Sequence, residues 1–300
     1  MRTKKPALWA IATTVGLLLS ACGSPSLSGG SASPAGSSSA TVAPVAADPA
    51  LHDKLPDRVK SSGTIIVGVD ATYKPNEYLD SDGKTVIGMD VELFDAVAAR
   101  MGVKTSWQPS AFNAILSGIQ ANKYDVGVSS FTINTERKKS VNMVSYLNAG
   151  TLWAVPVGNP KKIDPKSVCG QTIAVQTGTV QEDEMKAAQE KCPINNKITV
   201  LSFGDQGQVN NAVISGRAGA MLADSPITNF AIKQSNNKIE ALGEVTDSAP
   251  YGFVVSKSNT AFADAIAQAT RDIKKSGQYD AILAKYGQEN SATDQISVNP

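Results

Sequence analysis

Few side chains in this 300-residue sequence have the pattern that catalysis needs. The only histidine, His52, stands at the end of a stretch of small and polar residues, so a serine or cysteine nucleophile lacks a general base. The motifs GxSxG, HExxH and GxxxxGKS/T do not occur, and neither does a GxGxxG that follows a strand. Carboxylates are plentiful, but no spacing singles out an acid–base pair. The sequence therefore disfavours a hydrolase, and no catalytic residue is expected.

Cys22 directly follows a segment with the layout of a secretory signal. A basic start over residues 2–5 precedes an apolar run over residues 7–19, which is shorter than the roughly 20 residues that span a bilayer. Residues 19–22 (Leu-Ser-Ala-Cys) resemble the lipobox of bacterial lipoproteins. We therefore expect a cleaved signal peptide over residues 1–21. Cys22 would carry a diacylglycerol and an N-acyl chain such as palmitate, which anchor the exported protein to the outer face of the bacterial cell membrane. The alternative is an exported protein without lipid.

The other two cysteines, Cys169 and Cys192, form an even pair in an exported chain, a setting in which disulfides persist. A bond between them would close a loop of about two dozen residues and stabilise the fold by about 3 kcal/mol in the chain-entropy model. The alternative is two separate buried thiols. The sequence has no CxxC motif and no cluster of cysteine and histidine, so no zinc or other metal site and no cofactor is expected.

The charge balance excludes partners that need a strongly basic protein. Lys and Arg total 28 and Asp and Glu total 27, a net charge of +1, and removal of the three basic residues of the signal leaves −2. Nucleic acid is therefore not expected as a partner, and the membrane is expected only through the lipid anchor. Residues 23–47 carry no charge and are rich in Gly, Ser, Ala and Pro, which predicts a flexible linker within residues 22–52.

Beyond the linker, hydrophobic periodicity predicts an α/β fold. Residues 64–69 indicate a buried strand, and apolar residues at helical spacing over 89–101 end at Gly102. The next elements expected are a strand, a helix and a strand, over residues 103–107, 112–120 and 124–128. This β-α-β-α-β order is typical of a unit built on a largely parallel sheet.

A second series of elements follows, and about 240 ordered residues favour two domains over one. Strands are expected over residues 152–157, 172–175, 198–201, 218–222 and 251–256. Helices are expected over residues 180–191, 208–215, 225–233, 260–275 and 279–286.

Six segments carry a resemblance to a known family. They are Val67–Tyr73 (VGVDATY), Gly88–Leu93 (GMDVEL), Phe112–Asp125, Ser129–Arg137 (SSFTINTER), Gln176–Thr179 (QTGT) and Ala223–Pro226 (ADSP). In this order they resemble the motifs of polar-amino-acid-binding lipoproteins of ATP-driven importers, the extracellular solute-binding proteins of family 3. The likeness runs from about residue 55 to residue 287.

The resemblance implies a two-lobed periplasmic-binding-protein-like fold of type II, in which each lobe is a mixed sheet flanked by helices. Lobe 1 is expected over residues 53–149 and 249–300, and lobe 2 over residues 150–248. The two hinge crossings between the lobes are expected at Asn148–Thr151 and Asp247–Tyr251.

The resemblance also implies a site for the α-carboxylate of an amino acid. Arg137 would pair with the carboxylate through its planar guanidinium, and Ser130 and Thr132 would donate hydrogen bonds. Thr179 and the backbone N–H of Val180 would close on the same group from the other lobe, at a helix N-terminus. Without the likeness, Arg137 would be interpreted as part of a surface ion pair.

The rest of the ligand would meet a second set of implied contacts. Asp224 would accept from the α-ammonium, and its alternative role is a helix N-cap. Tyr73 and Phe112 would enclose the aliphatic part of the ligand, and core packing is their alternative. Ser129, Gln176 and Gln181 complete the implied set.

Asp70 would contact the far end of the ligand, which favours arginine, lysine, ornithine or glutamine and disfavours glutamate and aspartate. Its alternative is to cap local backbone N–H groups. One departure from the family pattern bears on this end. The family often has Y-x-P-F, whereas this chain has Asn76 after Pro75, and an inward Lys74 or Asn76 would allow an acidic or amide ligand.

We therefore expect a monomeric receptor, not an enzyme, that delivers a free amino acid to an ABC permease and its ATPase. Closure of the lobes on the ligand would be a population shift driven by contacts with both lobes. Two alternatives remain: a ligand-sensing ectodomain for a signalling partner, and a dehydratase-like enzyme on the same fold.

Overall fold

The computed structural model describes residues 44–300, so the predicted signal peptide, the lipidation of Cys22 and most of the predicted linker lie outside the described residues. The first helix, α1 (Pro49–His52), lies inside the segment predicted to be linker. Leu51 of this helix is buried and belongs to the same hydrophobic cluster as Val59 of α2 (Asp57–Ser62), so the folded part begins before residue 53. No helix of residues 44–300 is long and apolar enough to cross a membrane.

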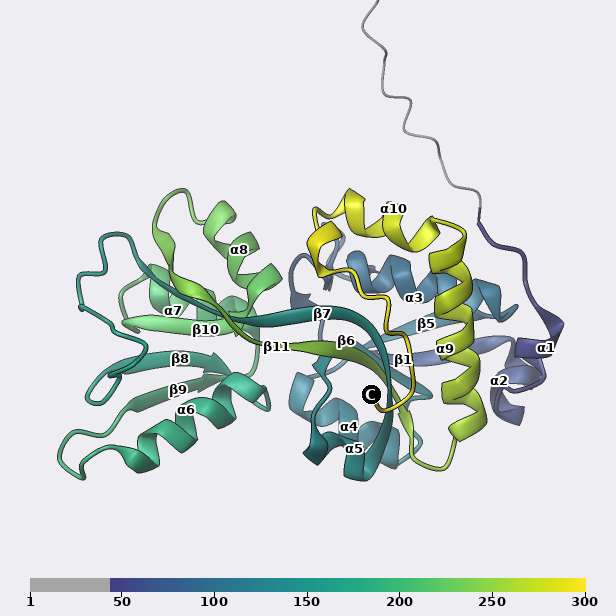
Figure 1. Ribbon diagram of the computed structural model, residues 1–300, viewed down its shortest axis with the longest axis horizontal. Helices are drawn as coiled ribbons and strands as arrows, with labels where there is room; N and C mark the ends of the chain where they lie inside the picture. The colour runs from purple at the N-terminus through teal and green to yellow at the C-terminus, as the bar shows by residue number, and fades with distance from the viewer. Residues whose placement is uncertain (1–43) are drawn as a thin grey trace, which may run out of the picture. The chain divides into compact units, whose positions relative to one another are not determined.

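One eight-stranded sheet extends through the described chain in the order β5-β1-β6-β11-β7-β10-β8-β9 (Figure 1). Its strands are β1 (Thr64–Val69), β5 (Lys104–Pro109), β6 (Val126–Thr132), β7 (Val141–Pro156), β8 (Thr172–Gln176), β9 (Thr199–Phe203), β10 (Ala220–Asp224) and β11 (Ile239–Ser256). β1 pairs in parallel with β5 and β6, and β8 pairs in parallel with β9 and β10, so each lobe holds a parallel unit. Antiparallel β7 and β11 join the two units into one mixed sheet.

β7 and β11 are much longer than the strands predicted at their positions. The strands predicted there, over residues 152–157 and 251–256, cover only residues 152–156 of β7 and residues 251–256 of β11. The missed part of β7 mixes polar side chains such as Asn142 and Ser145 with apolar ones, although nearly all of it is buried. The missed part of β11 is largely exposed and polar, so its sequence resembles a loop. Both strands pass from one lobe to the other (Figure 1).

Lobe 1 contains β1, β5 and β6 together with six further helices and a small sheet. The helices are α3 (Met89–Arg100), α4 (Phe112–Gln120), α5 (Thr135–Ser140), α9 (Thr260–Lys275), α10 (Gln278–Lys285) and the short 3₁₀ helix η1 (Glu289–Ser291). The bounds predicted for α4 and α9 are confirmed. The small sheet has the order β2-β3-β4 and consists of β2 (Thr72–Tyr73), β3 (Glu77–Leu79) and β4 (Val86–Ile87). The main hydrophobic cluster lies between α3, α9 and the sheet.

Lobe 2 contains β8, β9 and β10 with α6 (Val180–Lys191), α7 (Gln206–Ile214) and α8 (Ser225–Gln234). The bounds predicted for α6 are confirmed, and those of α7 and α8 differ by one or two residues at most. Two separate clusters fill this lobe, one around Trp153 and Ile173 and one around Val209 and Met221. Lobe 2 therefore has a core of its own, separate from the main cluster of lobe 1.

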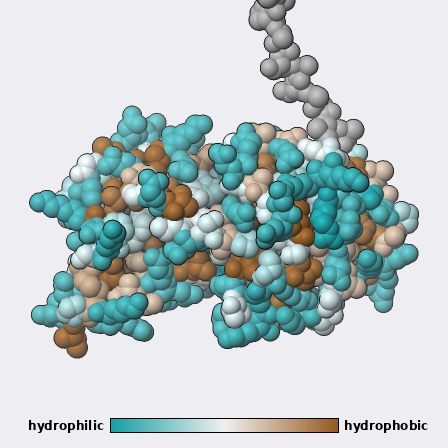
Figure 2. Space-filling model, in the orientation of Figure 1, coloured by the Kyte–Doolittle hydropathy of each residue, from teal (hydrophilic) through white to brown (hydrophobic). Residues whose placement is uncertain are grey.

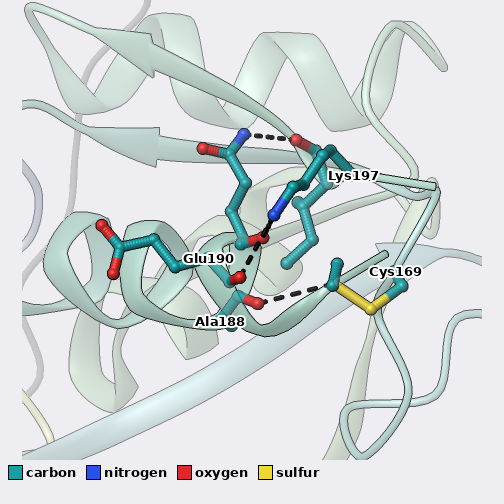
Figure 3. The surroundings of a disulfide bond; sticks show 7 residues. Cys169, Ala188, Glu190 and Lys197 are labelled. Atoms are coloured by element: carbon teal, nitrogen blue, oxygen red, sulfur yellow. Dashed lines mark hydrogen bonds between the residues drawn. A yellow bond between two sulfur atoms is a disulfide. The ribbon is translucent and has the colours of Figure 1, made fainter. Parts of the chain in front are cut away.

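The predicted disulfide between Cys169 and Cys192 is confirmed, and both cysteines belong to lobe 2 (Figure 3). Cys192 directly follows the last residue of α6, and its sulfur lies 3.4 Å from the carbonyl oxygen of Ala188. Lys197 donates from Nζ to the carbonyl oxygens of Gln189 at 2.9 Å and Glu190 at 3.1 Å. A cation at this position stabilises the carbonyl end of α6, so the disulfide and Lys197 together fix the end of the helix.

Hydrophilic residues cover most of the face drawn in Figure 2, and hydrophobic residues form separate patches on it. Within the described residues, the large hydrophobic side chains that are exposed are Val157, Ile194 and Val245. These three residues are far apart in the sequence.

Candidate functional site

A cavity between the two lobes contains most of the residues predicted to bind a ligand. Lobe 1 and lobe 2 each contribute one side. The lining residues are Tyr73, Phe112, Ser130, Thr132 and Arg137 from lobe 1, and Gln176, Thr179, Val180, Gln181 and Asp224 from lobe 2. Two other predicted residues, Asp70 and Ser129, are buried beside the cavity but do not line it.

Arg137 is held by contacts with both lobes. Asn134 caps the N-terminus of α5 by accepting from the backbone N–H of Arg137 at 2.8 Å. Nη1 donates to the carbonyl oxygen of Thr132 at 2.8 Å, and Nη2 donates to that of Gly178 in lobe 2 at 3.0 Å. Each of these nitrogens carries a second hydrogen, so one N–H of each remains for a ligand oxygen. The guanidinium therefore keeps N–H donors for a ligand oxygen.

Two aromatic rings hold the plane of the Arg137 guanidinium. Its central carbon lies 5.6 Å from the ring centroid of Phe112 and 5.5 Å from that of Phe131, and the two rings stack on each other. Burial lowers the pKa of Arg137, whereas the negative charges of Asp224 and Asp183 oppose that shift. The guanidinium remains charged, because arginine is not deprotonated in proteins.

The surface ion pair considered for Arg137 is formed by other residues. Glu136 pairs with Lys139 at 2.6 Å, and both side chains are exposed. Arg137 itself is only 9% exposed and points into the protein.

Ser130 and Thr179 line the cavity, but their hydroxyl groups already have partners. Ser130 Oγ accepts from Asn76 Nδ2 at 2.9 Å and lies within hydrogen-bond distance of Asp90 and Glu77, at 3.2 and 3.3 Å. Thr179 caps α6 and donates to the carbonyl oxygen of Gln176 at 2.7 Å. A hydroxyl has a single hydrogen, so neither group has a donor left for a ligand.

The N-terminus of α6 offers donors in their place. The first backbone N–H groups of a helix have no intrahelical acceptor, and the helix dipole favours negative charge there. Val180 and Gln181 occupy the first two positions of this 12-residue helix and line the cavity. The arrangement therefore presents backbone N–H groups from lobe 2 and the guanidinium of Arg137 from lobe 1.

Asp224 lies at the end of β10 and turns its carboxylate toward the cavity. It occupies the N-cap position of α8, yet its side chain makes no capping hydrogen bond. Its oxygens accept from Tyr73 Oη and from Gln181 Nε2, both at 2.8 Å, and the first of these bonds joins the two lobes. Burial raises the pKa of Asp224, while these hydrogen bonds and the charge of Arg137 oppose the shift.

Asp70 lies just after β1 and forms a second connection between the lobes. One of its oxygens accepts from Thr72 Oγ1 at 2.8 Å, and the other accepts a short hydrogen bond from Gln176 Nε2 in lobe 2. Its backbone N–H donates to Ser129 Oγ at 3.0 Å. Burial raises the pKa of Asp70 to about 6 in spite of its hydrogen bonds with Thr72 and Gln176. Asp70 thus contacts the cavity through Gln176.

The departure from the family pattern at residues 74–76 is resolved by the orientation of two side chains. Lys74 is exposed, and its ammonium lies 4.8 Å from the ring centroid of Tyr78. Asn76 is fully buried, but it contacts Ser130 and is not part of the cavity lining. Neither side chain points into the cavity, so neither provides the contact that would have allowed an acidic or amide ligand.

Several residues around the cavity were not predicted. Phe131 and the carbonyl oxygen of Gly178 hold Arg137, and Glu77 and Asp90 support Ser129 and Ser130 from behind. Phe131 lies inside the quoted segment Ser129–Arg137, so its position in that motif was a usable signal. Within residues 44–300, no group of acidic, cysteine and histidine side chains is arranged to hold a metal ion.

These features define a two-lobed solute-binding protein with a polar cleft between its lobes. Residues 65–289 match the sequence model of the bacterial extracellular solute-binding proteins of family 3. The arginine-binding protein ArgT of Corynebacterium glutamicum is 34% identical over 254 residues, which make up 84% of this chain and 83% of ArgT. The chain therefore belongs to family 3 of the bacterial extracellular solute-binding proteins, and the predicted family and fold are confirmed.

Two solved structures share the fold. They are ancestral arginine-binding proteins, one bound to arginine and one bound to glutamine. The first has a TM-score of 0.70 and 30% identity and covers 75% of this chain and 98% of its own. The second has a TM-score of 0.69 and 31% identity and covers 75% of this chain and 97% of its own.

Gly178 of lobe 2 lies in close contact with lobe 1, so a substitution there can test whether the closed form needs this close approach. Its φ is +85°, and an added Cβ would lie 2.8 Å from Cβ of Asn113 in α4 of lobe 1. We expect Gly178→Ala to shift the protein toward open forms, because the lobes would have to separate to relieve this contact. Small-angle X-ray scattering should then give a larger radius of gyration. Gly216→Ala is the matched control, since Gly216 also has a positive φ, +74°, and an added Cβ there meets nothing within 4 Å. Superimposable curves for the Gly178 variant and the wild type would contradict the expectation.

Proposed function

We propose that this chain is an extracytoplasmic receptor that binds a polar or basic amino acid between its lobes and delivers it to an ABC permease. Arginine is the favoured ligand. The observation that carries the proposal is that Arg137 of lobe 1 and Asp224 of lobe 2 line one cavity. An α-amino acid has a carboxylate and an ammonium group on one carbon atom, so both charges can be met only where a cation and an anion face the same space. The arginine-binding relatives support the choice of ligand.

At the carboxylate end, the N–H groups of Arg137 and the N-terminus of α6 would bind the two oxygens. Thr132 also lines this part of the cavity and would add a hydroxyl donor, whereas Ser130 and Thr179 would hold the backbone in place. The carboxylate would thus contact both lobes at once. Contacts with both lobes are what favour the closed form over the open form.

At the ammonium end, Asp224 would be the acceptor. Each of its oxygens already accepts one hydrogen bond, from Tyr73 or from Gln181, and each can accept a second. The aromatic rings of Tyr73 and Phe112 would cover the aliphatic part of the ligand, since both line the cavity.

At the side-chain end, Gln176 and the buried Asp70 would select the ligand. A guanidinium or ammonium group there would neutralise Asp70, and an amide could exchange hydrogen bonds with Gln176. A second carboxylate would face Asp70 at short range in a buried site, which is unfavourable. Arginine, lysine, ornithine and glutamine therefore fit this end better than glutamate or aspartate.

We also propose the lobe boundaries and the membrane attachment. Residues 49–149 with 249–300 form one lobe, since α1 packs into the cluster of that lobe, and residues 150–248 form the other. The hinge crossings lie in β7 and β11, where Pro250 pairs with Asn148 and Ala249 with Ala149. A lipid on Cys22 would anchor the receptor to the outer face of the cell membrane, and the segment before residue 49 would be the tether. The receptor would be a monomer.

Arginine binding by ArgT and by an ancestral protein favours a receptor over an enzyme. We therefore propose that the chain binds its amino acid without converting it. Chromatography of the ligand after long incubation would reveal conversion if the chain were a dehydratase-like enzyme. Binding to a sensor kinase in place of a permease would favour the signalling alternative.

A thermal-shift screen of the twenty amino acids, ornithine and citrulline tests the function directly. Stabilisation follows RT ln(1 + [L]/Kd), so a ligand at about 1,000 times its Kd adds about 4 kcal/mol. We expect arginine to raise the melting temperature most, followed by lysine, ornithine or glutamine. Stabilisation by aspartate or glutamate alone would overturn the assignment of Asp70, and stabilisation by no amino acid would overturn the function.

Arg137→Ala should abolish tight binding, because the ligand carboxylate would be buried without its main partner. We expect the affinity for arginine to fall by roughly 100-fold or more, measured by isothermal titration calorimetry. Arg217→Ala removes an exposed arginine from lobe 2 and is the matched control. Unchanged affinity in the Arg137 variant would exclude Arg137 from the carboxylate site.

Arginine binding should depend on pH through Asp70. The pKa of Asp70 is raised to about 6 in the described structure, and a bound cation would lower it. Binding at pH 6 should therefore release protons, and the affinity for arginine should fall as the pH drops below about 6. Calorimetry in buffers of different ionisation enthalpy measures this release. Glutamine binding and Asp70→Asn should show little release, and equal release in all three cases would contradict the role of Asp70.

A further inference from the structure

Two buried carboxyl groups lie together behind the cleft in lobe 1. Glu77 of β3 and Asp90 of α3 are both 0% exposed and lie within hydrogen-bond reach of each other. The segment before β3 and the start of α3 can approach so closely because residue 88 is glycine: an added Cβ there would lie 2.2 Å from the carbonyl oxygen of Asn76. The backbone N–H of Asp90 donates to that same oxygen at 2.9 Å.

No lysine, arginine or histidine within residues 44–300 forms an ion pair with either carboxyl group. The titratable groups that act on the pair are Asp70, directly after β1, Tyr73 of β2, Tyr146 of β7 and Tyr279 of α10, and all four are acids. Burial raises the pKa of Asp90 to about 6 and raises that of Glu77 well above its usual range, with the charge of Asp90 adding to the effect on Glu77.

The hydrogen bonds assign different roles to the two carboxyl groups. Asp90 Oδ2 accepts from the backbone N–H and the hydroxyl of Ser130, both at 3.2 Å, and from Tyr146 Oη. Asp90 also lies in the first turn of α3, where the helix dipole favours its ionised form. Its other oxygen, Oδ1, is buried and receives no hydrogen bond from an ordinary donor. A proton on Glu77 would give the Asp90 carboxylate a further donor, because the two carboxyl groups lie within hydrogen-bond reach of each other.

We propose that Glu77 and Asp90 share one proton and that this pair positions the Ser129–Ser130 turn, and through it both ends of the ligand cleft. Ser129 Oγ accepts from the backbone N–H of Asp70 at 3.0 Å and donates to Glu77 Oε1 at 3.2 Å. Ser130 Oγ lies 3.2 Å from Asp90 Oδ2 and 3.3 Å from Glu77 Oε2, and the φ of Ser130 is 51°, which is uncommon for a residue with a side chain.

Loss of the shared proton would place two negative charges side by side in a buried space, which drives the carboxyl groups apart. Ser130 would lose the contacts that hold its left-handed conformation, and Asp70 would lose its support through Ser129. The pair therefore limits ligand binding on the alkaline side, whereas Asp70 limits arginine binding on the acidic side. The effect on ligand binding rests on the proposed function, whereas the carboxyl pair itself rests on the structure.

The shared proton can be tested without a ligand by difference infrared spectroscopy of the full chain. We expect the wild type near neutral pH to show the band of a protonated carboxyl group that is absent from Glu77→Gln. Glu92→Gln, on the exposed side of α3 where Glu92 pairs with Lys285, is the matched control and should keep the band. If Glu77→Gln does not fold, Asp90→Asn takes its place: it replaces the charged acceptor of the shared proton with an amide, so the band should shift in frequency. A wild type without this band overturns the proposal.

Calorimetry with arginine then tests the positioning. An amide at residue 77 can still donate to Asp90 and accept from Ser129, so Glu77→Gln should bind with wild-type affinity at neutral pH and lose the alkaline decline. Glu77→Ala should weaken binding by roughly tenfold or more at every pH, because buried partners are left unpaired. Wild-type affinity in Glu77→Ala, or an unchanged alkaline decline in Glu77→Gln, overturns the positioning role. If no amino acid binds the wild type, the proposed function fails, and the infrared comparison still decides whether the proton is shared.

Discussion

The charge of Arg137 inside a nearly closed cleft is the constraint to which much of the surrounding structure responds. A guanidinium cannot lose its charge in a protein, so its burial must be offset by hydrogen bonds, aromatic faces and nearby anions. Thr132 and Gly178 accept from it, Phe112 and Phe131 hold its plane, and Asp224 and Asp183 supply negative charge. Because these groups come from both lobes, the requirements of one side chain already join the two lobes.

The fold meets these requirements at the carboxyl ends of its parallel strands. Asp70 follows β1, the Ser129–Thr132 segment ends β6, Gln176 ends β8 and Asp224 ends β10. Ligands of open α/β sheets bind beyond the carboxyl ends of strands, and here two such sets of strands face one cavity. Helix α6 then turns its N-terminus toward the same place, directly after β8.

The sequence predicted most of this arrangement, and its failures have physical causes. The helices α4, α6 and α9 were predicted to the residue, because each has a strong apolar face or clear end signals. β7 and β11 were only partly predicted, because their first parts mix polar and apolar residues in a way that local patterns assign to loops. The cavity lining was predicted from family motifs, since residue type alone does not show that Arg137 is buried. The sequence did not predict that the hydroxyls of Ser130 and Thr179 are already hydrogen-bonded within the protein. The carboxyl groups near Ser130, Glu77 and Asp90, are distant from it in the chain. The bond from Thr179 to the carbonyl oxygen of Gln176 depends on the exact conformation of the turn between them.

The disulfide has a consequence for how such a receptor can be strengthened. Both of its cysteines lie in lobe 2, 23 residues apart, and they close a loop that contains α6. A cross-link within one lobe reduces the freedom of the unfolded chain but leaves the other lobe free to rotate against it. A covalent bond across the cleft would fix one position of the lobes and prevent the protein from exchanging its cargo. Oxidation outside the cell can therefore make the protein more durable without slowing its working cycle.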